Sequence, residues 1–260
     1  MILYQDKPER ISKIFSVCSI CSRRETERLI KEGRISLNGA TVVEAGTKAI
    51  IGCDKIYKDG LLLDLKTGGS KDGFEYYILN KPVGYLTTCD DPFGRKTIFN
   101  LLSVKGHFFP AGRLDLNSRG LVLITNDGLL CGLVTHPGNM IEKEYIVTIN
   151  AELSGAQIKK LETGITYENE TYRALKISKI KNRVYKIILN EGKKREIRQM
   201  IKACKARVED LFRVKIANLS VVGLKEGASR KITPAELSEL KKITGYEKAA
   251  GDKALTNIGI

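Results

Sequence analysis

A polar, glycine-rich segment at residues 66–73 divides the chain into two parts. The segment contains three glycines and no apolar residue, which is typical of a flexible linker between folded units. The chain has 260 residues, and about one domain per 150 residues is usual. The sequence therefore predicts a small domain at residues 8–65 and a larger domain at residues 74–243.

The first part predicts two helices. Ile11, Ile14 and Phe15 recur at helical spacing and would form the apolar face of the first helix. Ser22 and Glu25 match the capping-box pattern, in which the side chains of both residues satisfy backbone amides at a helix start. A second helix should therefore begin directly after Ser22.

Short strands should follow these helices. An Asn-Gly pair at 38–39 is typical of a β-hairpin turn, and alternating apolar residues flank it within 35–43. Residues 54–57 and 61–65 have the same character. We therefore expect the first part to be a small α/β domain.

The second part predicts an α+β fold with a mixed, mostly antiparallel sheet. The segments rich in β-branched and aromatic residues lie at 76–79, 121–125, 145–149, 172–177, 184–189 and 213–222. The segments with helical periodicity lie at 129–134, 157–162, 196–203 and 234–242. Little periodicity remains in residues 244–260, for which we expect a flexible tail.

The charge of the chain points to a polyanionic partner. There are 44 Lys and Arg residues against 30 Asp and Glu residues, which gives a net charge of +14. Such a field attracts nucleic acid and disfavours acidic partners. The basic residues of the predicted helix pair are candidate RNA contacts, namely Arg10, Lys13, Arg23, Arg24, Arg28, Lys31 and Arg34.

Several other classes of protein do not fit the sequence. No run approaches the roughly 18 apolar residues of a membrane span, and the first ten residues lack the apolar stretch of a signal peptide. The six cysteines are scattered, which suits reduced thiols and a cytoplasmic protein without disulfides. Cys18 and Cys21 have no second pair of ligands nearby, and the two histidines are far apart. We therefore expect neither a metal site nor catalysis by a histidine cluster.

One acidic residue is placed as a catalytic group would be. Asp115 lies in a loop that leads through Gly120 into an entirely apolar segment at 121–124. A carboxylate at the edge of a buried strand is held rigidly. The alternative is that Asp115 only caps a turn. No second acid lies close enough in the sequence for the paired carboxylates of a glycosidase.

Several motifs resemble those of one enzyme family. The segment at 112–128 resembles the catalytic motif of the ribosomal RNA pseudouridine synthases that carry an N-terminal S-four domain, an RNA-binding module named after small-subunit ribosomal protein four. The resemblance extends, in family order, to 20–25, 33–39, 79–84, 142–145 and 191–200. It implies an S-four domain followed by a pseudouridine synthase domain that isomerises a uridine of ribosomal RNA without a cofactor.

The resemblance also implies roles for individual residues. Asp115 would be the catalytic aspartate, and Arg198 would form an ion pair with it. Tyr145 would lie against the target base or help to remove the proton from carbon five, although it shares one strand face with Val147 and Ile149 and can equally be a core residue. Leu211 would pack beneath the base.

Three further basic residues would contact RNA phosphates beside the site. Residues 181–198 carry seven basic and two acidic side chains, a net of +5. A run of this kind is usually a solvated face, but here it leads directly into the helix that bears Arg198. The resemblance places Arg113 near RNA as well. The candidate phosphate contacts in the run are Lys193, Lys194 and Arg195.

Two positions depart from the family pattern. Lys205 and Ala217 stand where the family usually has glycine. A residue other than glycine in a left-handed conformation costs about 1 kcal/mol, so we expect the local turns to differ. Ser118 replaces the commoner threonine but keeps the hydroxyl group.

The preferred substrate is large-subunit (23S) ribosomal RNA, because residues 20–25 and 142–148 resemble that branch of the family. The RNA would be recognised either alone or in an assembling subunit, by a monomer. Two other interpretations remain. A non-catalytic ribosome-assembly factor would keep the basic faces, and a transcriptional regulator would read DNA through residues 22–32.

Overall fold

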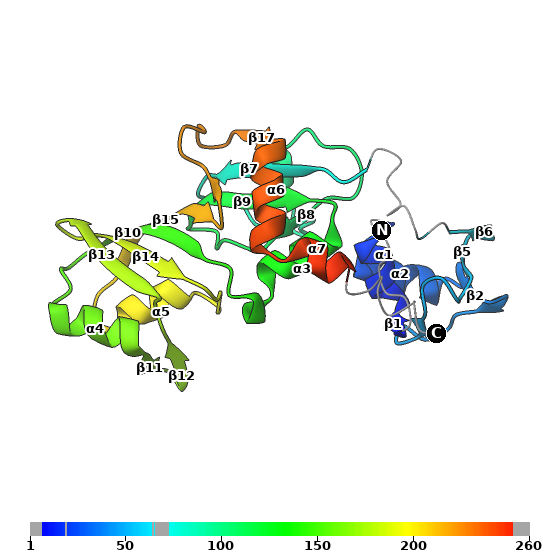
Figure 1. Cartoon of the computed structure of the whole chain (residues 1–260), viewed down its shortest axis with the longest axis horizontal. Helices are drawn as coiled ribbons and strands as arrows, with labels where there is room; N and C mark the ends of the chain where they lie inside the picture. Colours follow the sequence, from blue (N-terminus) through cyan, green and yellow to red (C-terminus); the bar gives the residue numbers. More distant parts are fainter. Residues whose placement is uncertain (1–6, 19, 64, 66–72, 252–260) are drawn as a thin grey trace.

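The computed structural model describes residues 7–18, 20–63, 65 and 73–251. Most of the predicted linker and the last nine residues of the predicted tail lie outside the described residues. Within the described ranges, no helix combines the length and apolar character that a membrane crossing requires. Figure 1 shows the small first part beside a larger sheet domain.

The first part has the two predicted helices followed by short strands, and one further short strand precedes the first helix. Ile11, Ile14 and Phe15 are fully buried and pack with Leu29 and Ile30 in one core. The helices are α1 (Ile11–Val17) and α2 (Arg23–Lys31). The strands are β1 (Glu9–Arg10), β2 (Ile35–Leu37), β3 (Ala40–Thr41), β4 (Lys48–Ala49), β5 (Ile56–Lys58) and β6 (Leu61–Leu62). The strands β3-β2-β5-β6 form a sheet, and β1 pairs with β4.

The start of α2 confirms half of the predicted capping box. The Ser22 hydroxyl accepts a hydrogen bond from the Glu25 amide at 3.1 Å. The Glu25 carboxylate instead accepts two hydrogen bonds from the Arg28 guanidinium. The Glu25 carboxylate thus binds an arginine one turn along the helix and not the Ser22 amide, which the capping box would require.

The larger part is a nine-stranded, mostly antiparallel sheet with the path β13-β14-β10-β15-β9-β7-β17. The α+β prediction is confirmed, and the pairing of β15 with β9 is parallel. The strands on this path are β7 (Tyr76–Lys81), β9 (Arg119–Thr125), β10 (Lys143–Ile149), β13 (Lys176–Lys181), β14 (Val184–Leu189), β15 (Val208–Ile216) and β17 (Ser229–Lys231). The strands β8 (Phe109–Ala111) and β16 (Leu219–Ser220) pair with β9 and β15, and β11 (Ile165–Tyr167) pairs with β12 (Glu170–Tyr172) in a separate ribbon.

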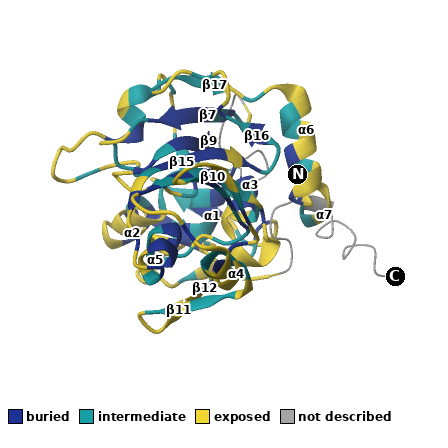
Figure 2. Cartoon of the chain, turned by 90° about the vertical axis from the view of Figure 1, so that its left-hand side faces the viewer, coloured by how far each residue is buried: buried dark blue, intermediate teal, exposed yellow. Residues whose placement is uncertain are grey.

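Strand β9 separates two apolar cores, which explains the entirely apolar run at 121–124 within it. Val122 and Ile124 lie in one core, and Leu121 and Leu123 lie in the other. Side chains alternate between the faces of a strand, so a strand covered on both faces is apolar throughout. Figure 2 shows the largely buried strands β7 and β9 at the centre of the sheet, and exposed residues along α6.

Helices cover both faces of the sheet. The first core includes side chains of α4 (Gly155–Thr163) and α5 (Glu196–Ala203). The second includes side chains of α3 (Gly128–Thr135), α6 (Pro234–Ile243) and α7 (Tyr246–Gly251). Two 3-10 helices, η1 (Ile98–Leu101) and η2 (Pro137–Asn139), complete the fold.

The first part packs against the larger part through α1 and α3. A Cβ atom at Gly128 would lie only 2.7 Å from the Cα atom of Val17. Only glycine permits so close an approach of two helices at this point.

Three predictions are corrected by the structure. The segment 172–177 is not one strand, because Tyr172 ends β12 and pairs with Ile165, whereas Ile177 belongs to β13 and pairs with Ile187. The strand predicted at 213–222 begins at Val208 and ends at a turn after Ile216. The start of the predicted tail forms α7, in which Tyr246 is buried in the second core.

Candidate active site

The loop between β8 and β9 presents Asp115 to solvent from a fixed turn. The Ser118 amide donates a hydrogen bond to the Asp115 carbonyl oxygen at 3.0 Å. Leu114 is buried beneath the loop, whereas the Asp115 side chain is 45% exposed. A rigidly held carboxylate that remains accessible can reach a substrate without first being uncovered.

Arg198 on α5 reaches the same loop. Its Nε atom lies 4.0 Å from Oδ2 of Asp115, and one of its terminal nitrogens donates hydrogen bonds to the Asn117 carbonyl oxygen (2.8 Å) and the Ser118 hydroxyl (3.2 Å). The predicted neighbourhood of Arg198 and Asp115 is therefore present in the structure. A close bidentate pair is not, because the guanidinium is shared along the loop. Burial lowers the pKa of Arg198, and the charge of Asp115 opposes this shift.

Lys81 supports the loop from below. It lies at the end of β7, is fully buried, and its Nζ atom donates hydrogen bonds to the carbonyl oxygens of Pro82 (3.0 Å), Asp115 (3.2 Å) and Ser118 (2.6 Å). Burial lowers its pKa to about 8. An ammonium group has three protons to donate, and each of them has a carbonyl partner here.

Arg213 holds the two ends of the loop from β15. Its Nε atom donates to the Leu121 carbonyl oxygen at 2.7 Å, and a terminal nitrogen donates to the Arg113 carbonyl oxygen at 3.4 Å. The side chain is buried, and its other terminal nitrogen has no hydrogen-bond partner among the described residues. The backbones are so close that a Cβ atom at Gly120 would lie 2.2 Å from the Arg213 carbonyl oxygen.

Sequence reasoning assigned no role to Lys81, Arg213 or Thr87. The Thr87 hydroxyl donates to the Leu114 carbonyl oxygen (2.8 Å) and accepts from the Leu114 amide (3.2 Å). The only available signal was the position of Lys81 within the motif at 79–84. The partners of these three side chains are backbone atoms, which leave no trace in a sequence pattern.

Tyr145 and Leu211 lie in the core beneath the loop. Both are buried, with 7% and 6% exposure, in the cluster that also contains Leu114. Tyr145 is opposite Arg213 on the neighbouring strand, and Leu211 is opposite Val147. Their proposed contacts with a target base remain predictions.

The basic turn before α5 is partly fixed. The Lys193 ammonium lies 3.3 Å from the Glu191 carboxylate and 5.7 Å from the centre of the Tyr172 ring. Lys194 and Arg195 are exposed, as is Arg113 on the loop. Of the three predicted phosphate contacts in this turn, two are therefore directed to solvent.

Glu196 anchors the start of α5. Its carboxylate accepts a hydrogen bond from the Lys193 amide at 2.9 Å, and the side chain is buried. Burial raises the pKa of Glu196 to about 7. The helix that carries Arg198 is thus anchored at its first residue to the basic turn.

The two departures from glycine do not alter the local turns. Lys205 and Ala217 both adopt left-handed conformations, with φ values of 60° and 49°. We expected the turns to differ, and this prediction is wrong. The packed sheet outweighs a conformational cost of about 1 kcal/mol per residue.

The seven predicted RNA contacts of the first part divide into two groups. Those with a carboxylate partner are Lys13 with Glu9, Arg28 with Glu25 and Glu32, and Arg34 with Glu32 and Asp59. Those that are exposed and form no ion pair within the described part of the chain are Arg10, Arg23, Arg24 and Lys31.

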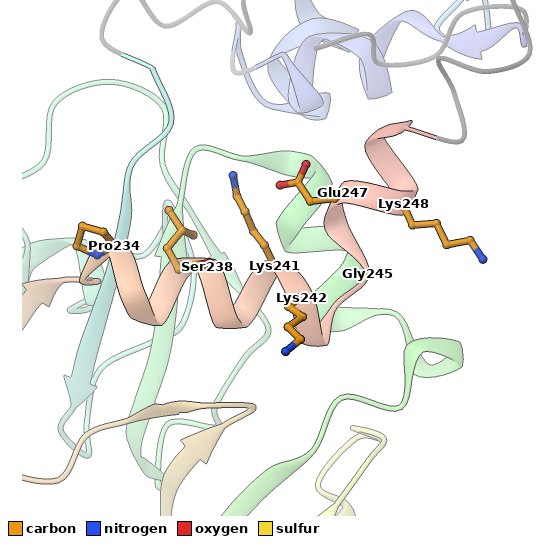
Figure 3. Close-up of a pocket in the computed structure, with 8 residues that line it drawn as sticks. Pro234, Ser238, Lys241, Lys242, Gly245, Glu247 and Lys248 are labelled. Atoms are coloured by element: carbon orange, nitrogen blue, oxygen red, sulfur yellow. The ribbon is translucent and has the colours of Figure 1, made fainter.

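A separate hollow lies on the C-terminal helices. It has a volume of about 640 Å³ and runs along α6 and α7, where Lys241, Lys242 and Lys248 line it (Figure 3). It contains none of the candidate site residues. Among the described residues, no three His, Cys, Asp or Glu side chains are grouped so that they could hold a metal ion.

Comparison with known proteins gives a consistent result. The family model for RNA pseudouridylate synthase matches residues 75–203. The chain is 32% identical over 249 residues to ribosomal large subunit pseudouridine synthase B of Bacillus subtilis, covering 93% of this chain and 99% of the relative. It is 33% identical over 250 residues to the dual-specificity RNA pseudouridine synthase RluF of Salmonella typhi, covering 96% and 84%.

A solved structure is similar over nearly the whole fold. It is described as a crystal structure of pseudouridylate synthase, and its TM-score is 0.65 at 28% sequence identity. The match covers 89% of this chain and 99% of that chain. The similarity therefore includes both parts of the molecule.

Proposed function

The chain belongs to the RNA pseudouridylate synthase family, and on this basis we propose that it converts a specific uridine of ribosomal RNA to pseudouridine. Large-subunit (23S) RNA is the favoured substrate, because one full-length relative is named as a large-subunit pseudouridine synthase. The single observation that supports this proposal best is the accessible Asp115 carboxylate next to Arg198, on a loop fixed by buried side chains.

The reaction exchanges one bond of the uracil base for another. The bond between N1 of the base and C1′ of the ribose breaks, the base turns, and C5 forms a bond to C1′ while its proton is lost and N1 gains one. Substrate and product are isomers, so no oxidant or energy donor is consumed. Asp115 would act as the nucleophile or as the carboxylate that stabilises the detached sugar.

Arg198 would hold Asp115 in position. Its Nε atom lies 4.0 Å from the Asp115 carboxylate, and its hydrogen bonds to Asn117 and Ser118 fix the loop at the same time. Tyr145 and Leu211 would contact the base once it leaves the RNA stack, with stacking as the favoured role for the tyrosine. Arg113, Lys194 and Arg195 would bind phosphates.

The first part would bind the RNA. We assign residues 8–65 as an S-four domain, residues 66–73 as a linker and residues 74–243 as the catalytic domain. Because Arg10, Arg23, Arg24 and Lys31 have no carboxylate partner among the described residues, they are available to RNA phosphates. The protein would act as a monomer in the cytoplasm, on free RNA or an assembling subunit.

The test is a map of the pseudouridines in ribosomal RNA from cells with and without this protein. We expect one or a few positions of the large-subunit RNA to lose pseudouridine when the protein is absent and to regain it when the protein is restored. Identical maps of both subunit RNAs would contradict the proposal.

A further inference from the structure

An exposed aromatic ring lies on a loop whose base is hydrogen-bonded to the Asp115 loop. Phe93, in the loop between β7 and η1, is 80% exposed. The Asp91 carboxylate accepts hydrogen bonds from the amides of Phe93 (3.1 Å) and Arg95 (3.0 Å), and its other oxygen pairs with the Arg95 guanidinium at 2.6 Å. The ring is therefore presented by a closed turn.

The base of this loop is joined to the Asp115 loop. The Leu86 amide donates to the Lys96 carbonyl oxygen at 2.9 Å and closes the loop, and the next residue, Thr87, makes two hydrogen bonds to Leu114. Phe93 is six residues from Thr87, which limits their separation to about 21 Å. The ring is thus within a few nucleotides of a uridine placed at Asp115.

The chemistry of the loop favours a nucleobase over a phosphate. Asp90 and Asp91 balance the charges of Arg95 and Lys96, so the loop has no net charge with which to attract the RNA backbone. The Arg95 guanidinium lies 5.2 Å from the centre of the Phe93 ring. An aromatic ring beside an arginine is the arrangement on which single-stranded bases stack.

We propose that Phe93 stacks on an unpaired base that neighbours the target uridine. This inference rests on the proposed function, because it requires an RNA at the Asp115 loop. A base next to the target must be unstacked when the uridine turns out of the RNA, and an aromatic ring replaces the stacking that this base loses. Phe93 would thereby stabilise the opened RNA.

The chain contains no tryptophan, so Phe93→Trp supplies a single fluorescent reporter at this site. The matched control is Ile180→Trp, which is also exposed (53%) but lies on β13, at the far end of the sheet path from β7. The probes are a ten-nucleotide oligouridylate and the same strand with abasic sites. Stacking on a base quenches indole fluorescence.

We expect the oligouridylate to quench the indole emission of the Phe93→Trp variant and the abasic strand to leave it unchanged, with no response from the control variant. Equal quenching by both strands, equal quenching in both variants, or no response from the Phe93→Trp variant would each overturn the inference. Because this measurement needs no turnover, its outcome is independent of whether the protein isomerises uridine.

A second comparison tests the effect on the reaction. Phe93→Ala should raise KM for substrate RNA about tenfold while lowering kcat far less, because one base-stacking contact is lost. Phe93→Tyr keeps an aromatic face and should restore the KM. If wild-type protein turns over RNA and the alanine variant has an unchanged KM, the stacking role is refuted and the proposed function stands.

Discussion

The two parts of the molecule use positive charge in different ways. At the candidate site, Lys81, Arg198 and Arg213 donate hydrogen bonds to backbone carbonyl oxygens of the Asp115 loop and its flanks. In the first part, Arg28 and Arg34 instead pair with carboxylates at the surface. The first arrangement fixes a segment of chain, and the second neutralises cations that could otherwise meet RNA.

Substitutions in the two parts should therefore differ in their effect on stability. An exposed ion pair contributes about 0 to 1 kcal/mol, because water and salt screen it. Removing a buried cation, or the groups that accept its hydrogen bonds, lowers the free energy of unfolding considerably more, because the remaining polar groups are left unpaired. Changes at the site should therefore affect turnover, and changes in the first part should affect RNA affinity.

The largest effect should come from Asp115→Asn. The amide keeps the shape of the side chain but cannot act as a nucleophile, so turnover should be abolished. RNA affinity should stay within about twofold of wild type, because the charge is not a phosphate contact. Tritium release from uridine labelled at carbon five measures the first quantity, and a binding titration measures the second. Measurable turnover by the pure variant would refute the role of Asp115.

Arg198→Lys should have the next largest effect. A lysine cannot reach the Asn117 carbonyl oxygen, the Ser118 hydroxyl and Asp115 with one planar group. We expect kcat to fall about 100-fold, with little change in affinity. Arg195→Lys is the matched control, because this arginine is exposed at the start of the helix that carries Arg198. Equal loss of rate and binding in the Arg198 variant would instead identify a phosphate contact.

Lys81→Met should lower kcat about tenfold at neutral pH. The methionine fills much of the space but removes the hydrogen bonds that the ammonium group donates to the carbonyl oxygens of Pro82, Asp115 and Ser118. The Asp115 loop should then be less precisely placed, while the fold remains intact. Single-turnover rates at saturating RNA test this expectation, and an unchanged rate would exclude a positioning role.

The same variant allows a test of pH dependence. The pKa of Lys81 is about 8 in the folded protein and 10.5 as its ordinary value, so between these pH values the unfolded chain binds more protons. The contribution of Lys81 to the free energy of unfolding therefore rises with pH in this range. The difference in unfolding free energy, wild type minus Lys81→Met, should rise by about 3 kcal/mol. A flat difference would show that folding does not lower the pKa of Lys81.

The smallest predicted effect is the difference in RNA affinity between the loss of an exposed cation without an ion pair and the loss of one with an ion pair. Arg24 is exposed without an ion pair among the described residues, whereas Arg28 lies between Glu25 and Glu32. Arg24→Gln should weaken RNA binding about threefold and lower the salt slope by about one. Arg28→Gln should change both quantities less. The reverse order would show that the surface ion pairs open when RNA binds.

Local patterns were sufficient for most of the elements. Helix α5 has the predicted bounds, and α6 begins at the predicted residue 234, after a complete capping box at Thr233. Each depends on residues within one or two turns. The failure at 172–177 has a different origin, because Tyr172 and Ile177 both look like strand residues and only their partners show that they belong to different sheets.

Side-chain chemistry and the family resemblance led to the candidate residues of the site, whose roles stay predictions. Asp115 was proposed from its place before a buried strand and from the resemblance, and Arg198 was proposed through the resemblance; the structure places the two side chains 4.0 Å apart. Lys81 and Arg213 were not found, because their partners are carbonyl oxygens as many as 100 residues away. A buried lysine or arginine looks the same in a sequence as an exposed one.

The most direct test of the divided roles is one variant of the full chain in which Arg10, Arg23, Arg24 and Lys31 are all replaced by glutamine. RNA affinity and single-turnover rate would be measured at several salt concentrations. We predict that this variant binds RNA about 100-fold more weakly at low salt and that its salt slope is reduced by up to about four. Its rate at saturating RNA should be unchanged. Unchanged affinity and slope, or a rate that falls at saturating RNA, would contradict this prediction.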